Sequence, residues 1–429
     1  MSALWCELAW LGGDEPEAGV LVEIEDGRIT AVGARAEPPA GAERLTGLTI
    51  PGLANAHSHA FQRALRGRTQ AGTGSFWTWR EQMYALADTL DPDSYLPLAR
   101  ATFAEMALAG ITVVGEFHYL HRGGNAMGEA VIQAAAEAGV RLTLLDACYL
   151  RGGLDCFRDR GPGAWAARVD ELRESETVRI GAAIHSVRAV DADSARSVAE
   201  WAAERGAPLH AHVSEQPAEN EACLDENGFT PTVTLAEAGA VSPAFTAVHA
   251  THLTETDITL LGFARVCLCP TTERDLADGI GPARRLREAG SKLCVGSDSQ
   301  AAIDLFEEAR AIELDERLAT GVRGSHSPAS LLEAATAGGY ESLGWPGGGR
   351  IAADAPADLA TISLDGVALA GTRFDDAIAA AVFAAGARDV RHVMVAGRWI
   401  VRDGAHVSLD VPAELDRTVR NTDNEGTVP

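Results

Sequence analysis

Histidines two residues apart end two apolar runs of this chain. His57 and His59 follow the run LTIPGLANA, and His210 and His212 end a run that begins at a proline. Side chains two positions apart in a strand point to the same side, so both imidazoles of one pair can reach one cation. One such pair is only a moderate sign of a metal site, since a histidine at a strand end often has a structural role.

Two further polar residues stand at the ends of other apolar runs. His249 follows the run FTAV, and Asp298 follows KLCVGS. Taken alone, His249 could be a hydrogen-bonded structural histidine, and Asp298 could be a turn or helix N-cap residue. Together with the two histidine pairs they supply at least three imidazoles and a carboxylate, which is a donor set that suits zinc or a similar divalent ion. The sequence therefore predicts a metal site.

The elements that must position these residues are short apolar runs, separated by Ala-, Leu- and Glu-rich stretches with helical spacing. Eight such runs end at His57, His118, Cys148, Ser186, Ser214, Thr251, Pro270 and Ser299. Alternation of strand and helix implies parallel strands, and eight units predict a (β/α)8 TIM-like barrel with its chemistry at the carboxyl ends of the strands. An open doubly wound sheet is the alternative, but no G-x-G-x-x-G follows an early strand.

The two ends of the chain carry β-rich runs. Asp26-Gly27 separates two such runs near the N-terminus, which is typical of a type I′ hairpin, and Ala396-Gly397 marks a second turn near the other end. Segments of this kind at opposite ends of a chain can combine into one small sheet domain. We therefore predict a composite β-sandwich domain from residues 1–50 and 352–410, a barrel over 51–351, and a C-terminal tail over 411–429 that is frayed from 421 onward.

Composition restricts the class of protein. The 429 residues are 46% hydrophobic and 23% charged, which is typical of a globular chain. The formal net charge of −25 argues against nucleic acid and anionic membranes as partners. Seven cysteines without a C-x-x-C pair indicate reduced thiols in a cytoplasmic protein, and we expect neither a signal peptide nor a membrane span.

The motifs around the polar strand ends resemble the amidohydrolase superfamily over nearly the whole chain, including the split β domain. Two-metal members of that superfamily typically bridge their ions with a carboxylated lysine at the end of strand four, whereas the fourth run here ends in His185-Ser186 and the sole lysine of the chain is Lys292. The resemblance thus implies a single divalent ion. Zinc is expected, with iron, cobalt and manganese as alternatives. The implied ligands are His57, His59, His212 and Asp298.

Longer motifs are similar to one family of that superfamily, the formimidoylglutamate deiminases. They are HAFQR from His59, FWTWRE from Phe76, GEFHYLH from Gly115, HSVR from His185, HVSEQ from His212 and CPTTERDLADGIGP from Cys269. The resemblance implies hydrolysis of N-formimino-L-glutamate to N-formyl-L-glutamate and ammonia, a step of histidine degradation. The expected partner is therefore a small dianionic substrate, and the expected assembly is a homodimer.

The same resemblance implies a role for each polar residue. His249 would orient and deprotonate the attacking water, Glu215 would deliver a proton to the departing nitrogen, and Asp298 would move the remaining proton. Arginine pairs well with carboxylates, although a surface ion pair is the commoner fate of a single arginine. The implied substrate-binding residues are Gln62, Arg80, Tyr119, His185 and Arg188.

Three alternatives stay open at this point. A deaminase of the same superfamily that acts on an aminopurine, a pterin or a related ring would need an aromatic slot and fewer arginines. A hydrolase of the same substrate that forms formamide and glutamate would differ only in its products. A barrel that has lost its metal and serves in assembly is disfavoured, because the whole set of predicted ligands is intact.

Overall fold

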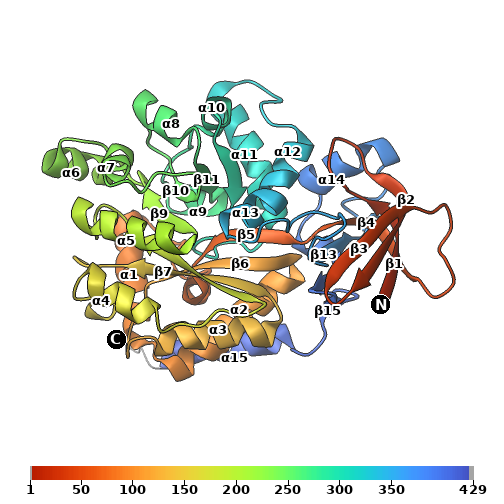
Figure 1. Cartoon of the computed structure of the whole chain (residues 1–429), viewed down its shortest axis with the longest axis horizontal. Coiled ribbons are helices and arrows are strands. Elements are labelled where there is room, and N and C mark those ends of the chain that lie inside the picture. Colours follow the sequence, from red (N-terminus) through yellow and green to blue (C-terminus); the bar gives the residue numbers. More distant parts are fainter. Residues whose placement is uncertain (1, 425–429) are drawn as a thin grey trace.

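The computed structural model describes residues 2–424, and its strands lie in two sheets (Figure 1). One sheet contains eight parallel strands in chain order, with helices around it. These strands are β5 (Leu53–Ser58), β6 (Ile111–His118), β7 (Arg141–Cys148), β8 (Val178–Ile184), β9 (Leu209–Val213), β10 (Phe245–His249), β11 (Arg265–Leu268) and β12 (Lys292–Val295). Each apolar run singled out in the sequence forms one of them, so the predicted (β/α)8 barrel is confirmed.

The helices between these strands follow local capping signals. Helix α5 begins after Asp191, whose carboxylate accepts a hydrogen bond from the backbone N–H of Ser194 (2.9 Å), and it ends at Gly206 in a left-handed conformation. The helices are α1 (Phe76–Thr89), α2 (Pro92–Leu108), α3 (Ala126–Ala138), α4 (Pro162–Val169), α5 (Ala192–Arg205), α6 (Pro217–Asn227), α7 (Pro231–Glu237), α8 (Glu255–Leu261), α9 (Pro270–Asp275), α10 (Ala283–Ala289), α11 (Leu305–Thr320), α12 (Pro328–Glu333), α13 (Gly339–Ser342), α14 (Ala377–Phe383) and α15 (Val411–Asn424). Short 3-10 helices are η1 (Ala60–Leu65), η2 (Asp155–Phe157), η4 (Phe374–Asp376) and η5 (Ala387–Asp389), and η3 (Ala334–Gly338) is a π-helix.

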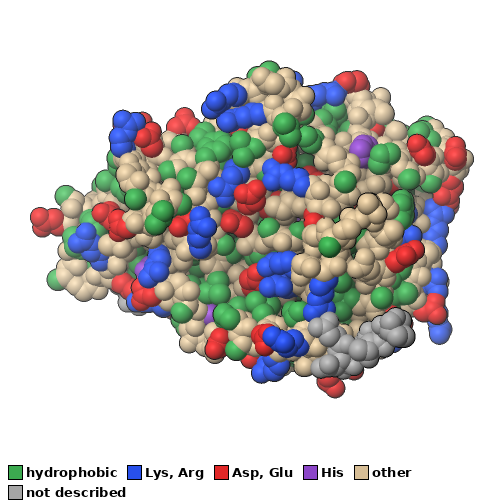
Figure 2. Space-filling model, turned by 180° about the vertical axis from the view of Figure 1, so that it is seen from behind, with side chains coloured by type: hydrophobic (Ala, Val, Ile, Leu, Met, Phe, Trp, Pro, Cys, Tyr) green, Lys and Arg blue, Asp and Glu red, His purple; other side chains and the backbone are tan. Residues whose placement is uncertain are grey.

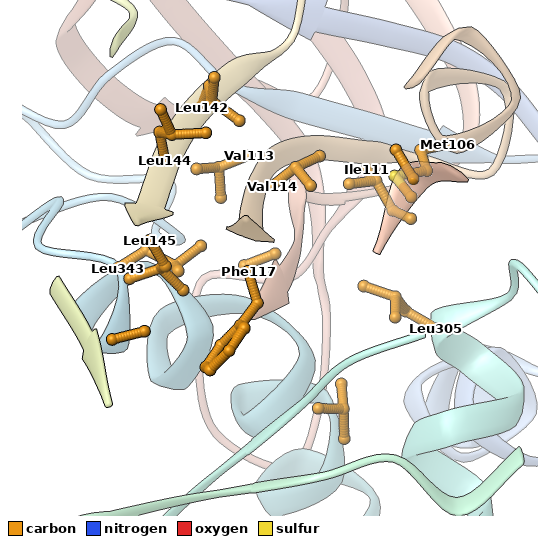
Figure 3. Close-up of a cluster of buried hydrophobic side chains, with 14 of the residues drawn as sticks. Met106, Ile111, Val113, Val114, Phe117, Leu142, Leu144, Leu145, Leu305 and Leu343 are labelled. Carbon is orange, nitrogen blue, oxygen red and sulfur yellow. The ribbon is translucent and has the colours of Figure 1, made fainter. Parts of the chain in front are cut away.

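The core of the barrel consists of apolar side chains from neighbouring strands (Figure 3). Strands β6 and β7 are buried along their whole length, which is why their sequences are nearly continuous apolar runs instead of alternating ones. In Figure 3, Val113 and Val114 of β6 lie beside Leu142 and Leu144 of β7. Burial of each such side chain contributes about 1.5–3 kcal/mol to folding. The ring of Phe117 reaches the carboxyl end, where its centroid lies 4.3 Å from that of His212.

The barrel closes where the chain after β12 meets β5. The backbone N–H of Asp298 donates to the carbonyl of His57 (3.0 Å), and the N–H of His59 donates to the carbonyl of Asp298 (3.1 Å). Gly296 permits this approach, because a Cβ at that position would lie 2.7 Å from the Cβ of His57. Barrel closure therefore brings Asp298 beside the first histidine pair, more than two hundred residues away in the chain.

The strands of the two chain ends build the second sheet, in the order β16-β15-β14-β13-β4-β1-β2-β3. They meet where β4 pairs antiparallel with β13, and the predicted sandwich takes the form of this one mixed sheet. The Asp26-Gly27 turn has positive φ at both residues (49° and 76°), as a type I′ hairpin requires. The strands are β1 (Ser2–Ala9), β2 (Glu17–Glu25), β3 (Arg28–Ala34), β4 (Glu43–Pro51), β13 (Leu359–Ile362), β14 (Val390–Val395), β15 (Arg398–Arg402) and β16 (Ala405–His406).

The segment after residue 410, expected as a tail, contains helix α15, which packs against α2 (Figure 1). Arg100 of α2 and Glu414 of α15 form an ion pair (2.8 Å) that joins the two helices. Of the residues expected to be frayed, 421–424 continue the helix, and 425–429 lie outside the described residues. The domain boundaries at residues 51 and 352 stay a prediction.

Charged side chains of both signs are interspersed on the face shown in Figure 2. On that face, therefore, acidic side chains are not gathered into one patch. Among residues 2–424, no helix is both long enough and apolar enough to cross a membrane.

Candidate active site

Four side chains converge at the carboxyl end of the barrel. His57 Nε2 lies 3.2 Å from His212 Nε2 and 3.3 Å from Asp298 Oδ1, and His59 Nε2 lies 3.4 Å from the same oxygen. Four nitrogen and oxygen ligands bound tetrahedrally at about 2.0–2.1 Å are about 3.3 Å from one another. His57, His59 and Asp298 have donor atoms within 4.8 Å of one another, and so do His57, His212 and His249, so each of these two groups could hold a metal ion.

Hydrogen bonds at the far side of two rings fix how these rings face the centre. His59 Nδ1 lies 2.9 Å from the carbonyl oxygen of Phe117, and His212 Nδ1 lies 2.9 Å from that of His185. A carbonyl only accepts, so Nδ1 carries the proton in both rings and the Nε2 lone pair points to the centre. Burial, with neighbouring His57, lowers the pKa of His59 to about 3 and that of His212 well below its ordinary value. Neutral rings are the form that binds a metal.

The backbone is strained at two of the site residues. His249 (φ 68°) and Asp298 (φ 45°) adopt the left-handed conformation, which residues with a side chain rarely use. Such a conformation costs of order 1–3 kcal/mol and persists only where the surroundings hold it. Here the N–H of Ala250 donates to the carbonyl of Val213 (3.1 Å), which fixes the turn after β10.

Three carboxylates surround His249. Its Nδ1 lies 3.4 Å from Glu273 Oε1, and its Nε2 lies 3.8 Å from Glu215 Oε1 and 3.7 Å from Asp298 Oδ2. Burial opposes a charge on the ring, but these carboxylates outweigh it and raise the pKa of His249 to about 10. These carboxylates therefore favour the charged form of the ring beside the ligand cluster.

Two arginines reach the same cavity. Arg188 Nη2 donates to Glu215 Oε2 (2.7 Å). The guanidinium carbon of Arg80 lies 4.5 Å from the ring centroid of Trp77 and 5.4 Å from that of Tyr84, and its buried Nε has no hydrogen-bond partner. Stacking holds the Arg80 guanidinium in place while leaving donors for a ligand.

The cavity combines polar groups with an aromatic wall. Gln62 Nε2 donates to the hydroxyl of Tyr119 (3.1 Å), and Gln62 Oε1 is buried without a partner. Burial, and secondly Arg188, holds the pKa of His185 well below its ordinary value, so that its ring is neutral. The aromatic wall consists of Phe76, Trp79, Tyr84, Tyr149 and Phe157.

A family model described as the amidohydrolase family matches residues 48–400. The chain belongs to the amidohydrolase family. A formimidoylglutamate deiminase from Pseudomonas aeruginosa is 36% identical to it over 95% of this chain and 96% of that protein. A 5-methylthioadenosine/S-adenosylhomocysteine deaminase from Halobacterium salinarum is 31% identical over 94% and 93% of the two chains. An 8-oxoguanine deaminase from P. aeruginosa is 30% identical over 93% of each.

Solved structures agree with this amidohydrolase fold. An amidohydrolase from Brucella melitensis matches with a TM-score of 0.90 and 29% identity, over 98% of this chain and all of that one. An adenosine deaminase from Xanthomonas campestris with bound zinc has a TM-score of 0.88 and 24% identity, over 99% and 98% of the chains. The chain is thus a deaminase of the amidohydrolase superfamily, a hydrolase of C–N bonds.

The structure of this amidohydrolase brings all the predicted site residues together. His57 is buried beside the cavity, in contact with His212 and Asp298. The others line the cavity: His59, Gln62, Arg80, Tyr119, His185, Arg188, His212, Glu215, His249 and Asp298.

Sequence reasoning missed two carboxylates and the aromatic wall. Glu273 stands in the helix that directly follows β11, and Glu219 stands in the first turns of α6, which follows β9. Both positions come just after a barrel strand, and this signal could have identified them. Cys269 also lies within reach of the centre, since one donor atom each from His249, Cys269 and Asp298 lie within 4.8 Å of one another.

Proposed function

We propose that this amidohydrolase hydrolyses N-formimino-L-glutamate to N-formyl-L-glutamate and ammonia. The observation that carries the proposal is the presence of two arginines, Arg80 and Arg188, in the cavity that holds the histidine and aspartate cluster. A substrate with an amidine and two carboxylates needs both features, because each carboxylate requires a cationic partner. The similarity to the deiminase from P. aeruginosa supports it.

One divalent ion, zinc, belongs to this proposal, with His57, His59, His212 and Asp298 as its ligands. An ion at that position lowers the pKa of water to about 7, so that hydroxide is available at neutral pH.

The side chains of the protein then move the protons. His249 Nε2, which faces Glu215 and Asp298, orients the attacking water and accepts its first proton once a divalent ion beside it disfavours the charged ring. Glu215 Oε1 lies 3.8 Å from His249 Nε2 and passes this proton on to the amidine nitrogen that leaves as ammonia. Asp298 Oδ2, which lies 3.7 Å from His249 Nε2, takes up the second proton of the attacking water and delivers it to the same leaving nitrogen. One water is consumed, its oxygen becomes the formyl oxygen, and one ammonia is released.

A second candidate function is deamination of a purine ring. The aromatic wall of the cavity favours it, since Trp79, Tyr149 and Phe157 could stack on a flat base. Two relatives with this kind of activity in their names, the 8-oxoguanine and methylthioadenosine deaminases, cover almost the whole chain. The two arginines argue for the dicarboxylate, because a neutral base offers no partner for them.

The deciding experiment is a steady-state assay of the zinc-loaded enzyme with N-formimino-L-glutamate, 8-oxoguanine and methylthioadenosine, with detection of ammonia and NMR of the products. Ammonia and N-formyl-L-glutamate support the proposal. Formamide and glutamate, or turnover of a purine alone, would overturn it. Glu215→Gln should keep its zinc and lose about two to four orders of magnitude in kcat. Glu221 is an exposed carboxylate of helix α6, which begins two residues after Glu215, and Glu221→Gln should behave like the wild type. The homodimer stays a prediction that sedimentation can test.

A further inference from the structure

Among its hydrogen-bonding and charged neighbours, the guanidinium of Arg188 has one that borders the cavity and two that do not. Its Nη2 donates to Glu215 Oε2 (2.7 Å), and Glu215 lines the cavity. On the other side, its Nε lies 3.3 Å from Ser186 Oγ and 3.9 Å from Glu219 Oε1. Two carboxylates therefore share one cation before any substrate carboxylate arrives.

The carboxylate of Glu219 is held rigidly. Its residue is 1% exposed, and its Oε2 accepts a hydrogen bond from the backbone N–H of Glu215 (3.0 Å). Its Oε1 is buried with no hydrogen-bond partner and has Arg188 as its neighbouring cation. The Glu215 side chain is the one that borders the cavity, so it is the one that can change partner.

We propose that the substrate carboxylate next to the amidine nitrogen takes Arg188 Nη2 from Glu215, while Glu219 keeps the guanidinium in place. This inference rests on the proposed function. Glu215 is freed for proton transfer only when that carboxylate is bound, and so Arg188 couples recognition of a carboxylate to catalysis. Glu219 is a positioning residue in this scheme, because it acts on Arg188 and not on the substrate.

The reason for the exchange is charge balance. A third carboxylate at Arg188 would place three anions around one cation, so one anion must leave. The α-carboxylate of the substrate is separated from the amidine nitrogen by one carbon atom. Its binding at Nη2 therefore puts the amidine close to the released Glu215. An amidine without this carboxylate leaves Glu215 paired with Arg188, and we expect it to be turned over slowly even at saturation.

The two glutamates give opposite predictions in one binding experiment. Calorimetric titration of the zinc-loaded enzyme with N-formyl-L-glutamate and with glutarate measures Kd without turnover. Glu215→Gln removes the competitor and should lower Kd about tenfold. Glu219→Gln keeps an oxygen for the Glu215 N–H but loses the charge that holds Arg188, and should raise Kd about tenfold. Glu221→Gln is the matched control for the loss of one negative charge on α6.

The outcomes separate this exchange from simple electrostatics and from the proposed activity. An equal decrease of Kd in Glu215→Gln and Glu219→Gln, or an unchanged Kd in Glu215→Gln, would overturn the exchange and leave the proposed activity intact. Tighter binding by Glu215→Gln with no turnover of N-formimino-L-glutamate by the wild type would overturn the activity alone. Failure of both the wild type and Glu215→Gln to bind either dicarboxylate would overturn the exchange as well.

If Glu219→Gln loses zinc or stability, the exchange can be tested instead by comparing the kinetics of the wild type on substrates that lack one carboxylate. N-Formimino-4-aminobutyrate lacks the α-carboxylate and should show a kcat at least tenfold lower than N-formimino-L-glutamate. N-Formimino-2-aminobutyrate lacks the side-chain carboxylate and should mainly show a raised KM. A raised KM with unchanged kcat for both compounds would overturn the exchange.

Discussion

A buried ion pair joins the barrel to the mixed sheet, and breaking it should destabilise the protein without changing its catalysis. Arg141 begins β7, and Asp358 stands directly before β13. Arg141 Nε and Nη2 donate to the two oxygens of Asp358 (2.7 and 3.3 Å), and the side chains are 7% and 1% exposed. The carboxylate also accepts from the hydroxyl of Tyr340 (2.8 Å) and the N–H of Ala396 (2.7 Å).

Arg141→Met keeps most of the aliphatic stem and removes the charge that Asp358 faces. Leaving a buried charge without its partner costs about 3–5 kcal/mol. The Coulomb attraction of two charges about 3 Å apart at an effective dielectric constant of about 20 is about 5 kcal/mol. This energy is of the same magnitude as the cost of leaving the charge unpaired. A chain of this length has an unfolding entropy of about 0.9 kcal/mol per degree, so the unfolding midpoint should fall by about 3–6 °C.

The assay is thermal and urea unfolding at a fixed zinc concentration, with the exposed pair Arg373 and Asp376 as the control. That pair has the same 2.7 Å separation, but its side chains are 78% and 51% exposed, so Arg373→Met should leave the midpoint unchanged. The double variant Arg141→Met/Asp358→Asn should lose less free energy of unfolding than the sum of the losses in the two single variants. The kcat should not change, because Arg141 lies at the amino end of its strand, opposite the site. A midpoint within one degree of wild type, or additive effects, would refute this reasoning.

Three further outcomes are expected. Arg80→Met should raise KM for the dicarboxylate about 10- to 100-fold with little change in kcat, because a charge-assisted hydrogen bond contributes about 1.5–3 kcal/mol. An unchanged KM would show that Arg80 does not bind the substrate. Chelation of the metal should abolish activity and lower the free energy of unfolding. The decrease should be about 4 kcal/mol relative to the enzyme with free zinc at 1,000 times its Kd, and added zinc should restore both properties. A chelated enzyme that stays active and stable would contradict the metal site. Burial, and secondly His121, lowers the pKa of His118 to about 3. As the pH falls, His118 therefore takes up a proton in the unfolded chain at a higher pH than in the folded chain. The free energy of unfolding should decrease below about pH 6.5, by about 2 kcal/mol at pH 5. His118→Phe should remove that part of the pH dependence, and unfolding curves with the same dependence in both proteins would argue against it.

The sequence by itself determined the order of the elements and most of the polar strand ends. Strands and hairpins depend on the side chains of neighbouring residues, so the apolar runs of β5 to β12 and the turn at Asp26-Gly27 could be read locally. His57 and His59 point the same way because of the two-residue repeat of a strand. The similarity of long motifs added roles that spacing alone could not assign.

Only the tertiary structure decided which of these residues meet, because such contacts depend on how the barrel closes and how its side chains fill space. Asp298 reaches His57 since Gly296 lets the last strand approach the first. Glu273 and Glu219 lie in helices that follow barrel strands, but only the folded chain shows that they lie beside His249 and Arg188. The pairing of Arg188 with Glu215 joins two strand ends 27 residues apart, and it is the contact from which we propose the link between substrate recognition and proton transfer.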